Sequence, residues 1–331
     1  MCWGRNDLRQ AAPDAGDDGL ITPVMVTWPV PIAQVAIGST HTCIRDGAGV
    51  VTCWGGNDRG QLGHGTITAQ APPATVALPA AAVQLAAGEH HSCARLVDRT
   101  LWCWGANSEG QLGQDDVDGA SPEPSPVQEA LGRTDWDEVD CGYGHTFARS
   151  GTEVFATGRN FQDQLGIVPD PGEQVRVLTA LGGPALAQIV GGQNFSCGRG
   201  VGGARWCWGN DNEAQLGDGA LVDQPAPVRV DDGPWRTLDV DTFHGCGLTP
   251  DGMVACWGRG IEGQLGTGDS GQRLVPTVAG TFDDWVAVST GRFHSCGQRA
   301  DASVWCTGRN EDGELGTGDL ERRYGWARVL W

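Results

Sequence analysis

Ten of the twelve cysteines in this chain stand in pairs with one fixed separation, and this spacing carries its clearest chemical signal. The two members of each pair lie ten residues apart on either side of a short turn, so they are expected to face each other on adjacent antiparallel strands. Side chains placed in this way can be bridged as disulfides. The five pairs are Cys43 and Cys53, Cys93 and Cys103, Cys197 and Cys207, Cys246 and Cys256, and Cys296 and Cys306.

A sixth hairpin acts as an internal control, because both of its cysteine positions are changed together. In the stretch HTFARSGTEVFATG they are occupied by Phe147 and Ala156. Paired loss is expected of a disulfide and not of unrelated buried thiols. Free thiols stay open as a less favoured alternative, and a metal centre is least favoured because the chain has no CxxC pairs. Five disulfides predict an oxidising compartment, hence an extracellular, periplasmic or cell-surface protein.

These hairpins belong to a repeat of about fifty residues that runs through the whole chain. Its strongest phrase is C-W-G-x-N-x-x-G-Q-L-G, preceded by an apolar alternation and a G-x-x-H-[ST]-C motif. Alternation of period two, interrupted by glycine, aspartate and proline, predicts short antiparallel strands and an all-β fold. The first glycine of the phrase recurs as Gly4, Gly55, Gly105, Gly158, Gly209, Gly258 and Gly308.

The phrase resembles the repeat of the regulator-of-chromosome-condensation family, in a bacterial, cysteine-containing form, across essentially all of residues 1–331. The G-Q-L-G element is intact in three copies and shifted to D-Q-L-G, A-Q-L-G or G-E-L-G in three others. Residues 4–12 keep only the opening Gly-x-Asn. The resemblance implies a seven-bladed β-propeller that forms a single domain over residues 1–331.

The two ends of the chain predict how the ring closes. Seven C-W-G-like units stand against six G-x-x-H units, and the last predicted strand is YGWARVLW. We expect an incomplete seventh blade, with an outer strand from the N-terminus, an inner strand from the C-terminus and no middle strands. A half-blade and an export signal are expected upstream. Cys2 is expected to pair with that upstream strand, whereas Cys141 has no repeat counterpart and is expected to be a free buried thiol.

The large apolar residues and the histidines of the repeat are expected to be structural. The tryptophan of C-W-G, the leucine of Q-L-G and the additional Trp136, Trp235 and Trp285 are predicted to pack between neighbouring sheets. Equivalent positions of neighbouring blades are too far apart to share one ion, so each histidine is expected to make a structural hydrogen bond within its own blade. These histidines are His41, His91, His145, His244 and His294, and Phe195 takes the remaining place.

Charge and composition narrow the classes of partner. A net charge of −19 leaves no basic stripe to neutralise phosphates, so nucleic acid is an unfavourable partner, and anionic membranes are repelled. No run approaches the roughly 18 apolar residues needed for a transmembrane helix. We expect a monomer without a transmembrane segment.

Catalytic and metal-binding motifs give no support for an enzyme or a cofactor. The chain has no G-x-S-x-G, H-E-x-x-H or phosphate loop. The acidic stretch 114–125 resembles a calcium loop, but Gln114 and Ser125 stand where acidic ligands are needed, so it is interpreted as a solvated loop. Asp218, Asp269 and Asp319 are interpreted as turn residues.

The most informative positions are the two residues between the repeated glycine and histidine, because they vary while their neighbours repeat. They should gather on one face of the disc around the channel, where a mixture of aromatic, amide and charged groups suits protein binding; drift of exposed residues is the alternative. The pairs are Ser39 and Thr40, Glu89 and His90, Tyr143 and Gly144, Gln193 and Asn194, Thr242 and Phe243, and Arg292 and Phe293.

These observations favour a non-catalytic, secreted or surface-displayed propeller that binds another protein through this face. The family resemblance offers guanine-nucleotide exchange on a small GTPase as the alternative, although the paired cysteines and acidic charge disfavour a cytosolic protein. A second alternative is carbohydrate binding at the channel mouth, for which Glu89, Tyr143, Phe243 and Phe293 are the available residues.

Overall fold

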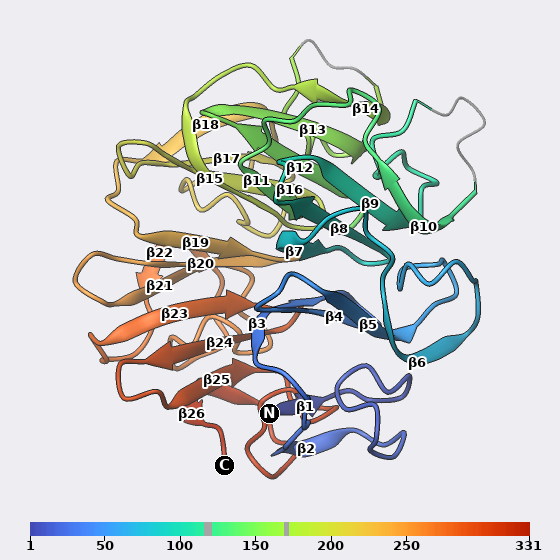
Figure 1. Ribbon diagram of the computed structural model, residues 1–331. Coiled ribbons are helices and arrows are strands. Elements are labelled where there is room, and N and C mark those ends of the chain that lie inside the picture. Colours follow the sequence, from blue (N-terminus) through green and yellow to red (C-terminus); the bar gives the residue numbers. More distant parts are fainter. Residues whose placement is uncertain (116–120, 169–171) are drawn as a thin grey trace.

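The computed structural model describes residues 1–115, 121–168 and 172–331, and every regular element in these ranges is a β-strand. Six antiparallel sheets of four strands and one sheet of two strands stand around a common axis, as in a propeller (Figure 1). The all-β prediction is therefore confirmed. The six complete sheets are called blades 1 to 6 in chain order, and the two-stranded sheet is called the half-blade.

The half-blade contains β1 (Cys2–Gly4) and β2 (Leu20–Val24). Blade 1 contains β3 (Ile32–Ile37), β4 (His41–Asp46), β5 (Val51–Gly56) and β6 (Gln70–Thr75), and blade 2 contains β7 (Ala82–Ala87), β8 (His91–Leu96), β9 (Leu101–Gly105) and β10 (Glu123–Gln128). Blade 3 contains β11 (Glu138–Cys141), β12 (His145–Ser150), β13 (Glu153–Arg159) and β14 (Gln174–Ala180), and blade 4 contains β15 (Leu186–Gly191), β16 (Phe195–Gly200), β17 (Arg205–Gly209) and β18 (Gln224–Asp231). Blade 5 contains β19 (Thr237–Val240), β20 (His244–Leu248), β21 (Val254–Gly258) and β22 (Arg273–Val278), and blade 6 contains β23 (Trp285–Thr290), β24 (His294–Arg299), β25 (Val304–Gly308) and β26 (Arg323–Arg328).

The C-terminal strand corrects the predicted closure of the ring. β26 pairs with β25 as the fourth strand of blade 6, and it does not join the half-blade as an inner strand. The physical reason is that β26 follows its G-E-L-G loop as the fourth strand of every other blade follows its own loop. The half-blade lies between blades 6 and 1 (Figure 1). Trp3 Nε1 donates to the Glu314 carbonyl of blade 6 (2.8 Å), and Trp54 Nε1 of blade 1 donates to the Gln10 carbonyl (3.1 Å).

The repeated tryptophans and leucines fill the spaces between blades, as predicted. Trp104, Trp208 and Trp257 are fully buried, and the additional tryptophans Trp136 and Trp285 are buried as well. In three blades the indole Nε1 donates to the main-chain carbonyl of the glutamine in the preceding blade's Q-L-G loop. These bonds join Trp104 to Gln61 (2.9 Å), Trp208 to Gln164 (2.9 Å) and Trp257 to Gln215 (2.7 Å).

The glycine of Q-L-G allows this close approach of one blade to the next. At Gly217 the backbone has φ +62°, and a Cβ there would lie 2.5 Å from the Trp257 ring. A side chain at this position would be both strained and obstructed.

The histidine bonds connect neighbouring blades, and the prediction of bonds within each blade is wrong. In four of the five histidines Nε2 faces a Ser or Thr hydroxyl that follows the histidine position in the next blade, whereas no such bond is found in the described chain for His294, which is followed by the half-blade. The pairs are His41 and Ser92 (2.8 Å), His91 and Thr146 (2.9 Å), His145 and Ser196 (3.4 Å), and His244 and Ser295 (2.8 Å). The hydroxyl in turn donates to a glutamine carbonyl, as Ser295 does to Gln264 (2.8 Å), so the imidazole must supply the proton of the first bond.

One interface of the ring lacks both partners of this bond. Phe195 replaces the histidine in blade 4, and Gly245 replaces the serine that would face it from blade 5. A Cβ at Gly245 would lie 2.5 Å from the Trp257 ring, which occupies the space of the missing hydroxyl. At this interface the histidine and the hydroxyl are therefore lost together.

Replacing Ser295 with alanine is expected to lower the free energy of unfolding by about 2 kcal/mol, because it leaves the His244 N–H and the Gln264 carbonyl buried without a partner. Ser295→Thr is the matched control. Threonine is found at the same repeat position as Thr146 and keeps the hydroxyl, so this variant is expected to lose clearly less stability than Ser295→Ala. Urea unfolding followed by tryptophan fluorescence measures both variants. Equal losses in the two variants would show that packing, and not the hydrogen bond, is responsible.

Candidate protein-binding face

The six variable residue pairs occupy tight turns between the first and second strands of the six blades. In five of these turns the repeated glycine N–H donates to the carbonyl of the histidine-position residue, as Gly88 does to His91 (2.9 Å), so the two variable residues form the tip. Neighbouring tips touch around the channel, because the Glu89 N–H donates to the Tyr143 carbonyl and the Tyr143 N–H to the Gly192 carbonyl (both 3.1 Å). We call these six tips, with the residues that border them, the turn face.

Aromatic and arginine side chains form one cluster on the turn face, where blades 5 and 6 meet. The Phe243 and Phe293 rings stack with their centroids 5.5 Å apart and 21° between their planes. The Arg259 guanidinium lies 4.9 Å from the centre of the Phe243 ring, and Arg292 and Arg309 lie 5.1 and 5.3 Å from the centre of the Phe293 ring. These distances allow cation–π attraction on both rings.

The arginines that follow the repeated C-W-G glycine were missed by the sequence reasoning. Arg159, Arg259 and Arg309 each follow that glycine, and their N–H groups donate to the turn-tip carbonyls of Gly144, Phe243 and Phe293 (2.9, 3.0 and 2.9 Å). The sequence could have identified these arginines, because the position after the glycine varies between blades as the turn tips do. Its other occupants in the complete blades are Gly56, Ala106 and Asn210.

Three arginines of the turn face have no acidic partner. In the described part of the chain, no carboxylate lies within 4.0 Å of a charged nitrogen of Arg159, Arg259 or Arg292. Arg309, in contrast, is 2.6 Å from Glu311. The charges of Arg159, Arg259 and Arg292 are therefore not neutralised by an ion pair within the described chain.

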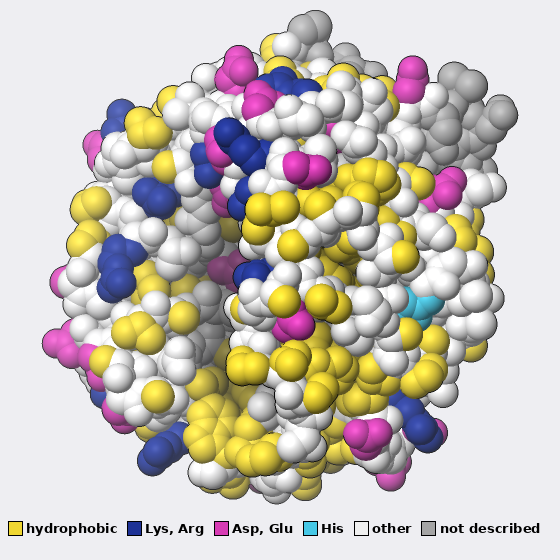
Figure 2. All heavy atoms as spheres, in the orientation of Figure 1, with side chains coloured by type: hydrophobic (Ala, Val, Ile, Leu, Met, Phe, Trp, Pro, Cys, Tyr) yellow, Lys and Arg dark blue, Asp and Glu magenta, His cyan; other side chains and the backbone are white. Residues whose placement is uncertain are grey.

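A second cluster lies across blades 2 and 3, beside a hollow of about 310 Å³ whose lining includes Arg59, Glu89, Tyr143 and Arg159. Burial, together with the nearby Glu89 carboxylate, raises the pKa of Tyr143 to about 12. His90 lies 3.6 Å from the same carboxylate. At neutral pH the phenol keeps its proton and offers a polar aromatic surface. Figure 2 shows that the centre of the ring is hollowed and bordered by both basic and acidic side chains.

The remaining predicted residues border the channel without joining either cluster. Thr40 Oγ1 accepts a 3.4 Å hydrogen bond from Gln61, and the Gln193 carbonyl accepts one of 3.3 Å from Gln164. The Asn194 carbonyl accepts from the Asn210 N–H (2.9 Å), and Ser39 is exposed at the tip of blade 1. The structure therefore divides the predicted face into two clusters and a polar remainder.

The cysteines form disulfides in the five predicted pairs, each with its Cα atoms 4.1 Å apart. Cys141 is a buried free thiol, as expected, and Cys2 is free and half-buried. The ligand atoms of His91, Cys93 and Cys141 lie within 4.8 Å of one another. Because the Cys93 sulfur is bonded to Cys103, this group does not offer three ligands to a metal ion.

The acidic loops behave as turns where the structure describes them. The carboxylates of Asp218, Asp269 and Asp319 accept main-chain N–H bonds two residues ahead (2.8, 2.9 and 3.0 Å), which confirms the prediction of turn residues. The interpretation of residues 114–125 as a solvated loop and not a calcium loop depends on residues 116–120, which lie outside the described ranges. No helix in the described residues is long and apolar enough to cross a membrane.

Fold and site together define an all-β propeller with one face built from variable turns. The chain matches the RCC1-like domain over residues 1–327, and it belongs to the RCC1-like domain family. A 40-residue stretch is 48% identical to human RCC1 domain-containing protein 1, but this match spans only 12% of the present chain and 11% of the human protein.

Solved structures support the same fold. Human WBSCR16 superposes with a TM-score of 0.88 at 22% identity, covering 99% of this chain and 94% of that one. Prp20p from Saccharomyces cerevisiae, described together with its binding to Gsp1p and histones, gives 0.84 at 22% identity, covering 99% and 85%. At these identities the likeness concerns the fold.

The buried histidines predict a specific loss of stability in acid. Burial, with a contribution from Arg159, lowers the pKa of His145 from 6.5 to about 3, so the unfolded chain binds a proton there that the folded chain does not. Stability is lost as the pH falls from 6.5 towards 3, with a slope of ~1.4 kcal/mol per pH unit for each such group. His145→Phe, which introduces the residue that blade 4 carries as Phe195, is expected to reduce the slope by one proton.

The measurement is the free energy of unfolding in urea at several pH values between about 4 and 7. Burial raises the pKa of Asp140 to about 7 and of Asp239 to about 6, and these carboxyls lower stability in the opposite direction, as the pH rises. They are the same in both proteins, so the difference between the two slopes isolates His145. Parallel slopes would show that His145 is already protonated in the folded protein.

Proposed function

We propose that this chain is a non-catalytic, exported propeller that binds another protein through its turn face. The observation that carries the proposal is the Phe243, Arg259, Arg292 and Phe293 cluster, which presents stacked aromatic rings and arginines at the channel mouth. Aromatic residues and arginine are enriched among the residues that dominate protein–protein affinity. The solved relatives named above include a protein described as binding other proteins, Prp20p.

The chemistry of the partner follows from the arginines of the turn face. Arg159, Arg259 and Arg292 have no acidic neighbour of their own within ion-pair distance among the described residues. A partner that brings carboxylates to them would gain charge-assisted hydrogen bonds, whereas a basic partner would leave them repelled. We therefore propose a partner whose contact surface is acidic and includes an apolar group that packs on Phe243 and Phe293.

The disulfides support export. Five hairpin disulfides in one chain are expected to persist only outside a reducing compartment. Guanine-nucleotide exchange is the alternative with support from the family, because Prp20p is described as binding Gsp1p. It requires a chain that works in the cytosol or nucleus, so the redox state of the cysteines in native cells separates the two proposals.

The face is tested by photo-crosslinking in the native cells. Benzoylphenylalanine in place of Phe293 is expected to give one discrete protein adduct, and the same probe in place of Val275, exposed on the outer strand β22, is expected to give none. Arg259→Glu should reduce the adduct at least tenfold by charge reversal, while Arg229→Glu, on the outer strand β18, should leave it unchanged. Equal adducts from both probe sites, or equal effects of both reversals, would contradict the proposal.

The compartment is tested by alkylating the protein from native cells before and after reduction. We expect ten cysteines to label only after reduction, while Cys141 labels in denaturant without it. Labelling of all twelve without reduction would contradict export. In that case accelerated nucleotide release from a purified small GTPase becomes the decisive assay, and its success would replace the present proposal.

A further inference from the structure

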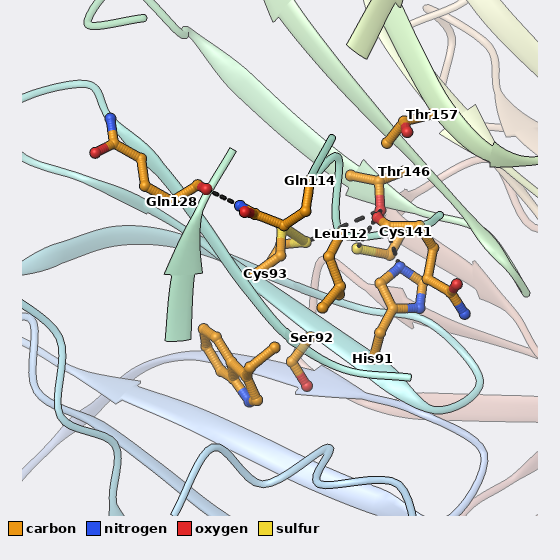
Figure 3. The surroundings of a disulfide bond; sticks show 12 residues. His91, Ser92, Cys93, Leu112, Gln114, Gln128, Cys141, Thr146 and Thr157 are labelled. Carbon is orange, nitrogen blue, oxygen red and sulfur yellow. Dashed lines mark hydrogen bonds between the residues drawn. A yellow bond between two sulfur atoms is a disulfide. The ribbon is translucent and has the colours of Figure 1, made fainter. Parts of the chain in front are cut away.

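A third sulfur lies beside one of the five disulfides. Cys141, on the inner strand of blade 3, points towards the Cys93–Cys103 bridge of blade 2 (Figure 3), and its Sγ lies within 4.8 Å of the Cys93 Sγ. Thr146 Oγ1 is in contact with both sulfurs, at 3.9 Å from Cys93 and 4.0 Å from Cys141. The three sulfurs are buried in the interface between the two blades.

The strand register explains why this position faces the neighbouring disulfide. Cys141 pairs with Thr146 across its own hairpin, as Ala87 pairs with Ser92 in blade 2 and Thr290 with Ser295 in blade 6. The hydroxyls of these partner residues all contact the first cysteine of the preceding blade's disulfide: Cys43 to Ser92 (3.9 Å), Cys93 to Thr146 (3.9 Å) and Cys246 to Ser295 (3.7 Å). Only blade 3 places a thiol at this position in the described chain.

Blade 3 is also the one complete blade without a disulfide of its own in the described structure. Phe147 and Ala156 stand opposite each other where the other blades have their cysteines. The blade that lacks a bridge therefore carries a spare thiol against the bridge of its neighbour. This combination of two independent features singles out the interface between blades 2 and 3.

We propose that Cys93 is an exchangeable sulfur that can be bridged to either Cys103 or Cys141. The Cys141 thiolate attacks Cys93 Sγ, a Cys93–Cys141 bond forms, and the Cys93–Cys103 bond breaks. The electron pair leaves on Cys103 Sγ, which takes up a proton equivalent to the one lost from Cys141. The exchange is an isomerisation and needs neither oxidant nor reductant.

The two isomers differ in what they hold together. The Cys93–Cys103 bridge lies within one hairpin, between β8 and β9, and closes a short loop. The Cys93–Cys141 bridge would join blade 2 to blade 3 across an interface that His91 and Thr146 otherwise connect by a hydrogen bond (2.9 Å). A bridge that closes a longer loop restricts the unfolded chain more. The site therefore offers a covalent clamp between blades, and it frees a thiol at Cys103.

The exchange is tested by disulfide mapping of the intact, oxidised protein. Burial and the nearby Asp140 carboxyl raise the pKa of the Cys141 thiol well above its ordinary value, with His91 as the other titratable neighbour, so the thiol is protonated at neutral pH. Incubation at about pH 9 without added thiol or oxidant increases the small thiolate fraction that attacks. After acid quenching, alkylation and digestion, mass spectrometry should find a Cys93–Cys141 peptide and an equal amount of alkylated Cys103. The other four bridges should rearrange at least tenfold less.

Two variants control the result. Cys141→Ser should abolish the labelling of Cys103 while leaving the native bridge intact. In that background Ala87→Cys places a thiol beside the Cys43–Cys53 bridge, and it should now produce a link from Cys43 to the introduced cysteine, with labelled Cys53. Absence of the Cys93–Cys141 peptide in the parent protein would overturn the proposal. Equal scrambling among all five bridges would also overturn it, because random exchange indicates unfolding and not a specific contact between Cys141 and Cys93.

Discussion

The ring depends on one main-chain carbonyl per interface, that of the glutamine in the Q-L-G loop or, after blade 6, of Glu314. This carbonyl projects from one blade to the next and accepts a hydroxyl proton, an indole proton or both, as Gln61 does from Ser92 (3.0 Å) and Trp104 (2.9 Å). The hydroxyl then accepts the histidine N–H of the earlier blade. Because every member is buried, removal of one leaves the others unsatisfied, and the cost exceeds that of a single surface hydrogen bond. The repeat keeps these residues in most copies for this reason.

Sequence periodicity was sufficient for the strands, the tryptophan core and the cysteine pairs, because each follows from spacing along one hairpin. It failed where a residue acts between repeats. The histidines were assigned to bonds within a blade. Comparison of the repeat copies shows which position each histidine takes, but not towards which blade its side chain points. The sequence did contain the evidence, because His is replaced by Phe195 in one unit and Ser by Gly245 in the next. These changes can be related to each other only when the two units are known to be adjacent in space. Residues 4–12 likewise seemed to keep little of the motif, yet the Gln10 carbonyl accepts from both Thr42 (2.7 Å) and Trp54 (3.1 Å) in the manner of Gln61.

The candidate face was predictable only in part, for a related reason. Variation at the turn tips was visible in the sequence, and the structure groups Phe243 with Phe293 and Glu89 with Tyr143. The arginines at positions 159, 259 and 309 lie about fifteen residues after their tips, across a complete hairpin. Their contact with the tips depends on the ladder that returns the third strand to the same end of the blade.

The division between frame and tips also explains how such a face can change without loss of the fold. The tips contribute main-chain bonds to the ring, for example from the Glu89 N–H to the Tyr143 carbonyl, and these bonds are available to any residue other than proline on the donor side. Their side chains therefore carry little of the stability. Binding chemistry can then be built from side chains whose replacement leaves the histidine, hydroxyl and glutamine contacts below them intact. The arginines of the turn face in an otherwise acidic chain are an outcome that this freedom permits, because the packing of the blades does not depend on these side chains.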